Sequence, residues 1–155
     1  MQLGSGSWGV SPSITWTGQT NYWSWGTQAK AKIYLSDNSE DYQLGNQVEG
    51  TVWGARRWSD SFSTSLRASI SHKGNIRGAD DLIPQVNGMG VPIVPTADPD
   101  LRGGTRVDLS LGANILILGT GARLGLEFGV PVYQNLDGPQ LGADWFATAG
   151  VQYTF

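Results

Sequence analysis

The sequence predicts an all-β protein, an antiparallel up-and-down transmembrane β-barrel of which about seven strands are visible. Apolar and polar residues alternate with a period of two in these segments, as in strands with one apolar and one polar face. The segments suit tilted strands of about 9–11 residues that cross a bilayer. Short and long connections alternate strictly along the chain, which is typical of outer-membrane barrels.

The composition agrees with a single β-rich domain over residues 1–155. The chain has 22 Gly and 7 Trp, and its charged fraction of 15% is well below the value of about 25% found in soluble domains. It has no apolar run of 18 residues, which excludes helical membrane spans. The absence of Cys excludes disulfides, thiolate metal sites and Cys nucleophiles. Because the net charge is -3 and the basic residues are scattered, we expect no nucleic-acid partner.

The first two expected strands, 7–17 and 23–35, each have one face of aromatic and aliphatic residues. The apolar residues are Trp8, Val10, Ile14 and Trp16 in the first strand and Trp23, Trp25, Ala29, Ala31, Ile33 and Leu35 in the second. The polar face of the second strand carries Lys30 and Lys32. These alternations favour strands with their apolar face toward lipid.

The third expected strand, 47–58, has no clearly apolar face. One face would hold Val48, Val52 and Arg56, and the other Glu49, Trp53 and Arg57. We place Glu49 and Arg57 with the polar rows of the other strands.

The next three expected strands, 62–72, 106–118 and 122–133, alternate more regularly. Their apolar rows are Phe62, Leu66, Ala68 and Ile70, then Val107, Leu109, Leu111, Ala113, Ile115 and Ile117, then Leu124, Leu126, Phe128, Val130 and Val132. Pro131 lacks a backbone donor, so it indicates a bulge or the end of its strand.

The last expected strand, 144–155, puts aromatic and aliphatic residues on one face up to the terminal residue. A strand that ends on an aromatic residue resembles the C-terminal signature of bacterial outer-membrane barrels, which the barrel-assembly machinery reads. This resemblance implies that Tyr153 and Phe155 form an assembly signal. The alternative is a soluble antiparallel protein that ends on an edge strand.

The connections predict how the strands cross the membrane. Short connections lie at 18–22, 59–61 and 119–121, and long ones at 36–46, 74–105 and 134–143. Short turns are periplasmic and long loops extracellular in such barrels, so 74–105 is expected to be a long extracellular loop. Since bacterial barrels have an even strand number, we expect the C-terminal portion of a larger even-stranded barrel, with missing N-terminal strands or a partner chain completing it.

Several motifs occur in the order found in a proteobacterial family. They are residues 1–7 (MQLGSGS), 23–26 (WSWG), 42–45 (YQLG), 65–67 (SLR), 96–104 (TADPDLRGG) and 127–141 (EFGVPVYQNLDGPQL). They resemble outer-membrane transporters associated with the meta-pathway of phenol degradation. The resemblance covers nearly the whole chain and implies passage of small, often hydrophobic or aromatic compounds.

Charged residues on the polar rows are the candidate lumen lining. They are Lys30, Lys32, Arg67, Arg106, Asp108, Arg123 and Glu127. The last five come from three consecutive expected strands, where opposite Cβ atoms lie about 5 Å apart. Two interpretations remain open, because these groups either pair with one another and fill the interior or contact a solute.

The long loop is more apolar than a solvated loop requires. The residues expected to form a constriction or entrance are Leu82, Ile83, Val86, Met89, Val91 and Ile93. Four Pro residues within 80–102 exclude a regular helix or central strand there. The alternative is that this segment packs on a partner or a neighbouring protomer.

We expect no enzyme activity, no cofactor and no metal. His72 is the only His and lies on the apolar row, while the neighbouring Ser71 points to the other face. Acidic loop residues are ordinary turn residues, with divalent bridging to lipopolysaccharide as the lesser alternative. Trp8, Trp16, Trp23, Trp25 and Trp145 are expected at the membrane interfaces.

The function expected from these patterns is passive passage of small solutes, hydrophobic or aromatic ones among them, through the bacterial outer membrane. Its expected surroundings are outer-membrane lipid, lipopolysaccharide and the barrel-assembly machinery. The alternative is a structural or interaction protein whose strands complete or associate with another chain.

Overall fold

The computed structural model describes residues 6–39, 41–78 and 98–154. Their regular structure is almost entirely antiparallel β-strand, with one 3-10 turn, η2 (Pro99–Leu101), and no α-helix in these ranges. No helix of the described residues is long and apolar enough to cross a membrane. The expectation of an all-β, antiparallel up-and-down fold is confirmed.

One large sheet contains nearly all the strands. They are β1 (Gly9–Val10), β2 (Ser13–Gln19), β3 (Trp23–Tyr34), β5 (Gln47–Arg57), β6 (Phe62–Lys73), β8 (Gly104–Ile117), β9 (Ala122–Leu136) and β10 (Phe146–Tyr153). β1 and β2 both pair with β3, and from β3 to β10 each strand of this sheet pairs with the next one along the chain, so the order is a simple meander. All seven expected strands are present, with ends that differ by a few residues.

The first expected strand is interrupted near its middle. β1 and β2 both pair with β3, and the pairing of Val10 with Ile33 continues in the same register to that of Ser13 with Lys30. Pro12 lies between them, and its carbonyl accepts a hydrogen bond from the Ala31 amide at 3.0 Å. Because Pro has no amide proton, the hydrogen-bond ladder with β3 is interrupted at Pro12. β1 and β2 still act together as one edge strand of the sheet.

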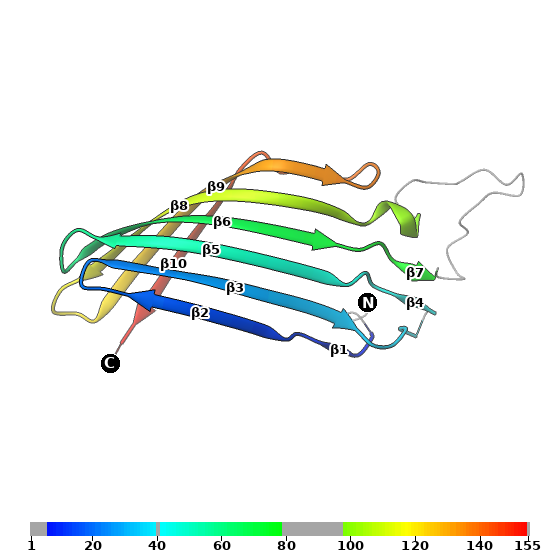
Figure 1. Cartoon of the computed structure of the whole chain (residues 1–155), viewed down its shortest axis with the longest axis horizontal. Helices are drawn as coiled ribbons and strands as arrows, with labels where there is room; N and C mark the ends of the chain where they lie inside the picture. The colour runs from blue at the N-terminus through cyan, green and yellow to red at the C-terminus, as the bar shows by residue number, and fades with distance from the viewer. Residues whose placement is uncertain (1–5, 40, 79–97, 155) are drawn as a thin grey trace, which may run out of the picture.

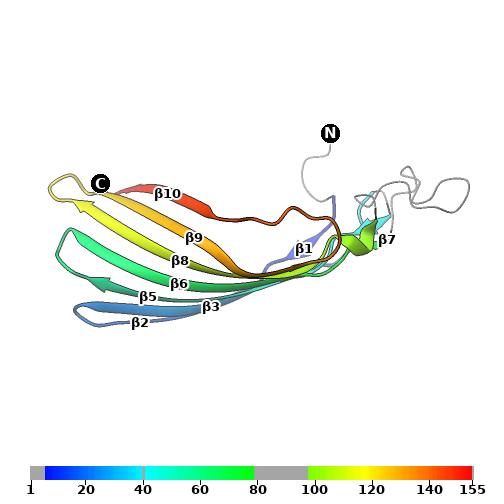
Figure 2. The ribbon, with the colours of Figure 1, turned by 90° about the horizontal axis from the view of Figure 1, so that it is seen from above.

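The sheet is strongly curved and open. Figures 1 and 2 show a trough, with β2 on one side and β10 on the other. Within the described residues, β2 pairs only with β3 and β10 only with β9, so each has one unpaired edge. The three short turns gather at one end, and the long connections leave from the other (Figure 1).

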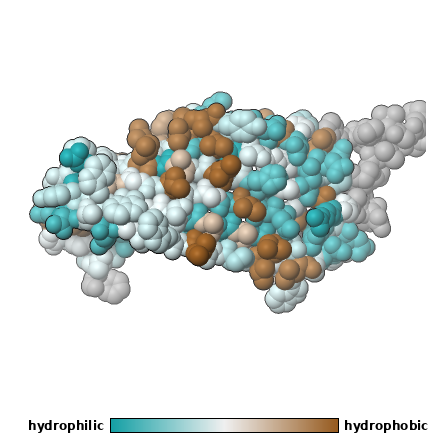
Figure 3. All heavy atoms as spheres, viewed as in Figure 1, coloured by the Kyte–Doolittle hydropathy of each residue, from teal (hydrophilic) through white to brown (hydrophobic). Residues whose placement is uncertain are grey.

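The register sorts side chains by polarity onto the two sides of the trough. On β8, Ser110 is 5% exposed and its neighbour Leu111 is 67% exposed. The concave face carries the polar rows, represented by Thr51, Asp108 and Ser110, which curvature crowds together and buries. The convex face carries the apolar rows, and Figure 3 shows hydrophobic side chains over the middle of the strands on this side.

The facing of β5 is now clear. Glu49 pairs with Lys30 and Ser71, and Trp53 pairs with Gly26 and Arg67, so both lie on the concave face, as does Arg57. Their placement with the polar rows agrees with the sequence-based expectation. Val48, Val52 and Arg56 take the convex face.

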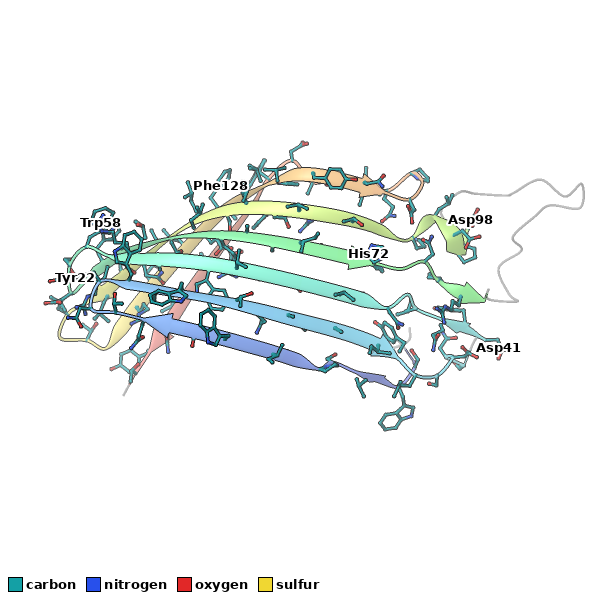
Figure 4. The ribbon with its side chains drawn as sticks, viewed as in Figure 1. Tyr22, Asp41, Trp58, His72, Asp98 and Phe128 are labelled. Atoms are coloured by element: carbon teal, nitrogen blue, oxygen red, sulfur yellow. The ribbon has the colours of Figure 1, made fainter. Side chains whose placement is uncertain are left out.

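Arg56 is accommodated on the convex face by aromatic rings. Its guanidinium carbon lies 4.0 Å from the centre of the Trp58 ring and 5.3 Å from that of Trp23. Cation–π contacts of this kind stabilise a charge among apolar neighbours. Trp58 and Tyr22 mark this end of the sheet in Figure 4, at the short turns.

The bulge indicated by Pro131 is present. Val107 pairs with Tyr133, but the next residue, Asp108, pairs with Pro131. Val132 is therefore left without a partner on β8, as in a β-bulge. Beyond the bulge, Tyr133 rather than Val132 continues the convex row of β9.

Large rings cover glycines on adjacent strands. A methyl group at Gly26 would overlap the Trp53 ring, and one at Gly129 would overlap the Phe146 ring. Both rings lie on the concave face. These glycines thus make room for aromatic side chains that would otherwise project farther into the trough.

At the loop end of the sheet, Asn75 links neighbouring segments by hydrogen bonds. Its side-chain oxygen accepts hydrogen bonds from the amides of Arg102 and Gly103, and its nitrogen donates to Asp137 at 3.1 Å. A small ribbon, β4 (Tyr42–Gln43) with β7 (Arg77–Gly78), joins the loops that follow β3 and β6. The residues proposed for a loop constriction, between 82 and 93, lie outside the described residues, as does Phe155.

Replacing Gly26 by Ala tests the ring-over-glycine packing. We expect Gly26→Ala to lower the free energy of unfolding by roughly 1–3 kcal/mol, because the added methyl displaces Trp53. Gly54→Ala is the matched control on the paired strand, where nothing lies within 4 Å of an added Cβ. Chemical unfolding in detergent measures the free energy of unfolding of both variants. An equal loss in the two variants would contradict this packing.

Candidate functional site

The concave face brings the predicted polar residues into rows that run across the strands. One row contains Lys30, Glu49, Ser71 and Arg106, on four successive strands. The next contains Gln28, Thr51, Ser69 and Asp108. Both rows therefore combine charged side chains with hydroxyl or amide side chains.

A hollow of about 330 Å³ lies in the middle of this face and is called the central hollow here. Its lining residues are Glu49, Thr51, Arg67, Ser69, Ser71, Arg106, Asp108, Ser110, Glu127 and Phe146. Four of the seven residues predicted to line a lumen therefore share one hollow. Apart from Phe146, every lining side chain is polar or charged.

Arg67 and Glu127 form an ion pair across an intervening strand. The Arg67 Nη2 and Glu127 Oε2 atoms lie 3.3 Å apart, although β8 separates β6 from β9. The β8 residues between them are Ser110 and Gly112, opposite Arg67 and Glu127 respectively. Their small size lets the long arginine side chain reach over the strand.

Arg106 and Asp108 form the second pair, within β8. The Arg106 Nε donates to Asp108 Oδ2 at 3.0 Å. The Asp108 side chain is only 8% exposed, whereas Arg106 keeps 40% of its side-chain surface exposed. Asp108 Oδ1 is buried and has no hydrogen-bond partner. A buried acceptor of this kind favours a ligand or water molecule that donates a hydrogen bond to it.

The other predicted lining residues lie outside the central hollow. Lys30 is on the concave face opposite Glu49, and no ion pair joins them among the described residues. The Lys32 ammonium lies 5.0 Å from the centre of the Tyr34 ring. Arg123 lies toward the short turns, away from the paired charges. Two arginines are thus paired with carboxylates, as the first interpretation expects, and contact with a solute stays a prediction.

A second hollow, of about 450 Å³, lies at the short turns and is called the turn hollow here. It includes Arg57 from β5 and Arg123 from β9. Neutral polar groups surround them, among them Gln19, Asn21, Ser63 and Asn114, and Asp60 lies on the turn.

Sequence reasoning missed several residues of the central hollow. Thr51, Ser69 and Ser110 carry no charge and so gave no signal beyond their place in a polar row. Phe146 belongs to the polar row of β10 by its even spacing from Thr148, but its apolar side chain hid that assignment.

The convex face contains none of the paired charges. His72 lies at its loop end, exposed, and its Nδ1 is 2.9 Å from Thr105 Oγ1 (Figure 4). Phe128 stacks on Trp145 with ring centres 6.0 Å apart. Tyr153 is exposed at the end of β10, on the same face. Among the residues the structure describes, no group of three or more His, Cys, Asp or Glu is arranged to hold a metal ion.

Comparisons with known proteins give no match for this chain among family models, curated proteins or solved structures. The resemblance to phenol-pathway transporters therefore stays a prediction from the motifs.

Replacing the two paired arginines separates their contributions to stability. Arg106→Met leaves the buried Asp108 carboxylate without its donor, so we expect a loss on the order of 3 kcal/mol. Arg67→Met leaves Glu127, which is 23% exposed and can be hydrated, so we expect less than about 1 kcal/mol. Denaturant titration measures the free energy of unfolding of both variants. Adding Asp108→Asn to Arg106→Met should restore part of the loss, and no restoration would show that packing dominates.

Proposed function

We propose that this chain forms part of the wall of a bacterial outer-membrane β-barrel through which small solutes pass. Its convex face contacts outer-membrane lipid, and the long loops lie beside lipopolysaccharide. The concave face lines the passage. Delivery by the barrel-assembly machinery would use the aromatic C-terminal strand.

The distribution of polarity between the two faces carries this proposal. Among the described residues, the only buried large hydrophobic residue is Tyr34, whereas Leu66, Leu109, Leu111, Phe128 and many others are exposed. The buried polar residues include Thr51, Asp108 and Ser110. Exposing so many contiguous apolar side chains to water is unfavourable, at about 25 cal/mol per Å². Lipid would remove this cost, and water would fill the polar trough.

The convex face also has the arrangement of residues that a bilayer favours. Trp16, Trp23, Trp25 and Trp58 lie toward the short turns, and Trp8 and Trp145 lie toward the loops. Aliphatic residues occupy the rows between them. Tryptophan rings prefer the interfaces of a membrane, so the two groups are consistent with the two sides of one bilayer.

Thiol labelling tests the lipid contact, since the chain has no native Cys. Leu111 and Thr148 are both exposed, on the convex and the concave face respectively. In protein reconstituted into bilayers, a charged water-soluble thiol reagent should modify Thr148→Cys rapidly and leave Leu111→Cys unmodified. Rapid modification of both positions would refute burial of the convex face in lipid.

A structural or interaction role is the second candidate, because β2 and β10 each leave one edge unpaired. The two strands run in the same direction, since five strands of alternating direction separate them. Pairing β2 directly with β10 would therefore be parallel. An added segment with an odd number of strands would instead close the sheet in antiparallel fashion, which is the arrangement of bacterial barrels.

Liposome swelling distinguishes the two candidates. If the chain alone provides a passage, proteoliposomes should swell in small sugars faster than protein-free liposomes. Thr148→Trp should slow this swelling by narrowing the concave face, and Leu111→Trp should not. If the chain alone gives no swelling but a strand-bearing partner segment restores it, the interaction role is correct.

A further inference from the structure

We propose that the turn hollow binds a small anion, a carboxylate or a phosphate group, between Arg57 and Arg123. This inference goes beyond the passage of solutes, because binding at this position requires only the folded trough. It also means that the surface proposed to line the passage would favour negatively charged solutes.

Arg57 and Arg123 lie on the same face of the trough and line the same hollow. Arg57 lies on β5 and Arg123 on β9, with β6 and β8 between them. Three strand spacings and an offset of two residues along β9 put their backbones about 16 Å apart, and curvature shortens that distance. Both side chains project into the same hollow of about 450 Å³. Two long side chains of this type are therefore able to contact one small ligand from opposite sides.

These two arginines differ from the others in the large sheet. Arg67 and Arg106 pair with carboxylates, and Arg56 contacts two tryptophan rings. Arg57 and Arg123 take part in no side-chain hydrogen bond, ion pair or ring contact among the described residues. Their donors are thus available, and the planar guanidinium group suits bidentate contact with carboxylate or phosphate.

The rest of the hollow supports an anion rather than a cation. Asn114 and Ser63 lie in the row of Arg57 and provide neutral donors. The one acidic lining residue, Asp60, is exposed at the turn between β5 and β6 and forms no ion pair with either arginine. The site therefore has two positive charges facing one solvated carboxylate.

The concave face as a whole has the same sign. The described basic residues on it are Lys30, Lys32, Arg57, Arg67, Lys73, Arg106 and Arg123, and the acidic ones are Glu49, Asp108 and Glu127. The whole chain has a net charge of -3, so positive charge is concentrated on this face. A trough with a net positive charge raises the local concentration of negatively charged solutes.

Anion binding can be measured on the full chain folded in a nonionic detergent. The ¹⁵N resonances of the arginine Nε–H groups would be followed during titration with sodium phosphate, sodium acetate or detergent doped with phosphatidylglycerol. We expect the Arg57 and Arg123 signals to shift and saturate while Arg56 stays unchanged. Saturation with phosphate or acetate identifies a soluble anion, and saturation with phosphatidylglycerol alone identifies a lipid headgroup.

Arg57→Gln and Arg123→Gln should each weaken binding roughly tenfold or more, because each removes a charged hydrogen-bond donor. Arg56→Gln is the matched control, since it removes the same charge from the adjacent residue on the convex face and should leave affinity unchanged. Asn114→Asp keeps both arginines and should abolish binding by placing a carboxylate between them. Wild-type signals that do not shift, or equal weakening by Arg56→Gln, would overturn the proposal.

Discussion

The continuous antiparallel register from β2 to β10 is the constraint on which the rest of this structure depends. Side chains alternate between faces along each strand, so the register decides which residues of neighbouring strands share a face. A slip of one residue between β6 and β8 would put Leu66 beside Ser110 and break the separation of polar and apolar rows. The ion pair between Arg67 and Glu127 also depends on it, because the small residues of β8 must lie beneath the arginine.

This register produces a molecule with its polarity reversed relative to a water-soluble sheet protein. The polar face is the crowded one, and the apolar face is the exposed one. Backbone ladders, cross-strand contacts and rings over glycines hold the described part of the fold together, since it has almost no apolar interior. Removing the exposed apolar side chains of the convex face from water would stabilise this arrangement. The surroundings of the convex face therefore contribute to the free energy of folding of this chain.

The sequence was sufficient to predict the strands, the alternation of short and long connections, and most of the facing. Each of these features depends on the local spacing of apolar and polar residues, which is visible in a single sequence. The facing of β5 was less clear, because Arg56 lies on the apolar side and Trp53 on the polar side. The structure explains these two residues, because Arg56 contacts the rings of Trp23 on β3 and of Trp58 just beyond β5, and Trp53 lies in the space above Gly26. The pairing of Arg67 with Glu127 over β8, and the lack of carboxylate partners for Arg57 and Arg123, depend on curvature that no local pattern encodes.

The unequal connections have a consequence for the order in which this sheet assembles. The hairpins β2–β3, β5–β6 and β8–β9 have short turns, whereas about 30 residues connect β6 to β8. Closing the longer connection costs roughly 2 kcal/mol more in chain entropy than closing a turn of a few residues. We therefore expect the three hairpins to form first. We expect the hairpins to join in the final register later, with the hydrogen bonds that Asn75 accepts from the residues before β8 holding β6 beside β8.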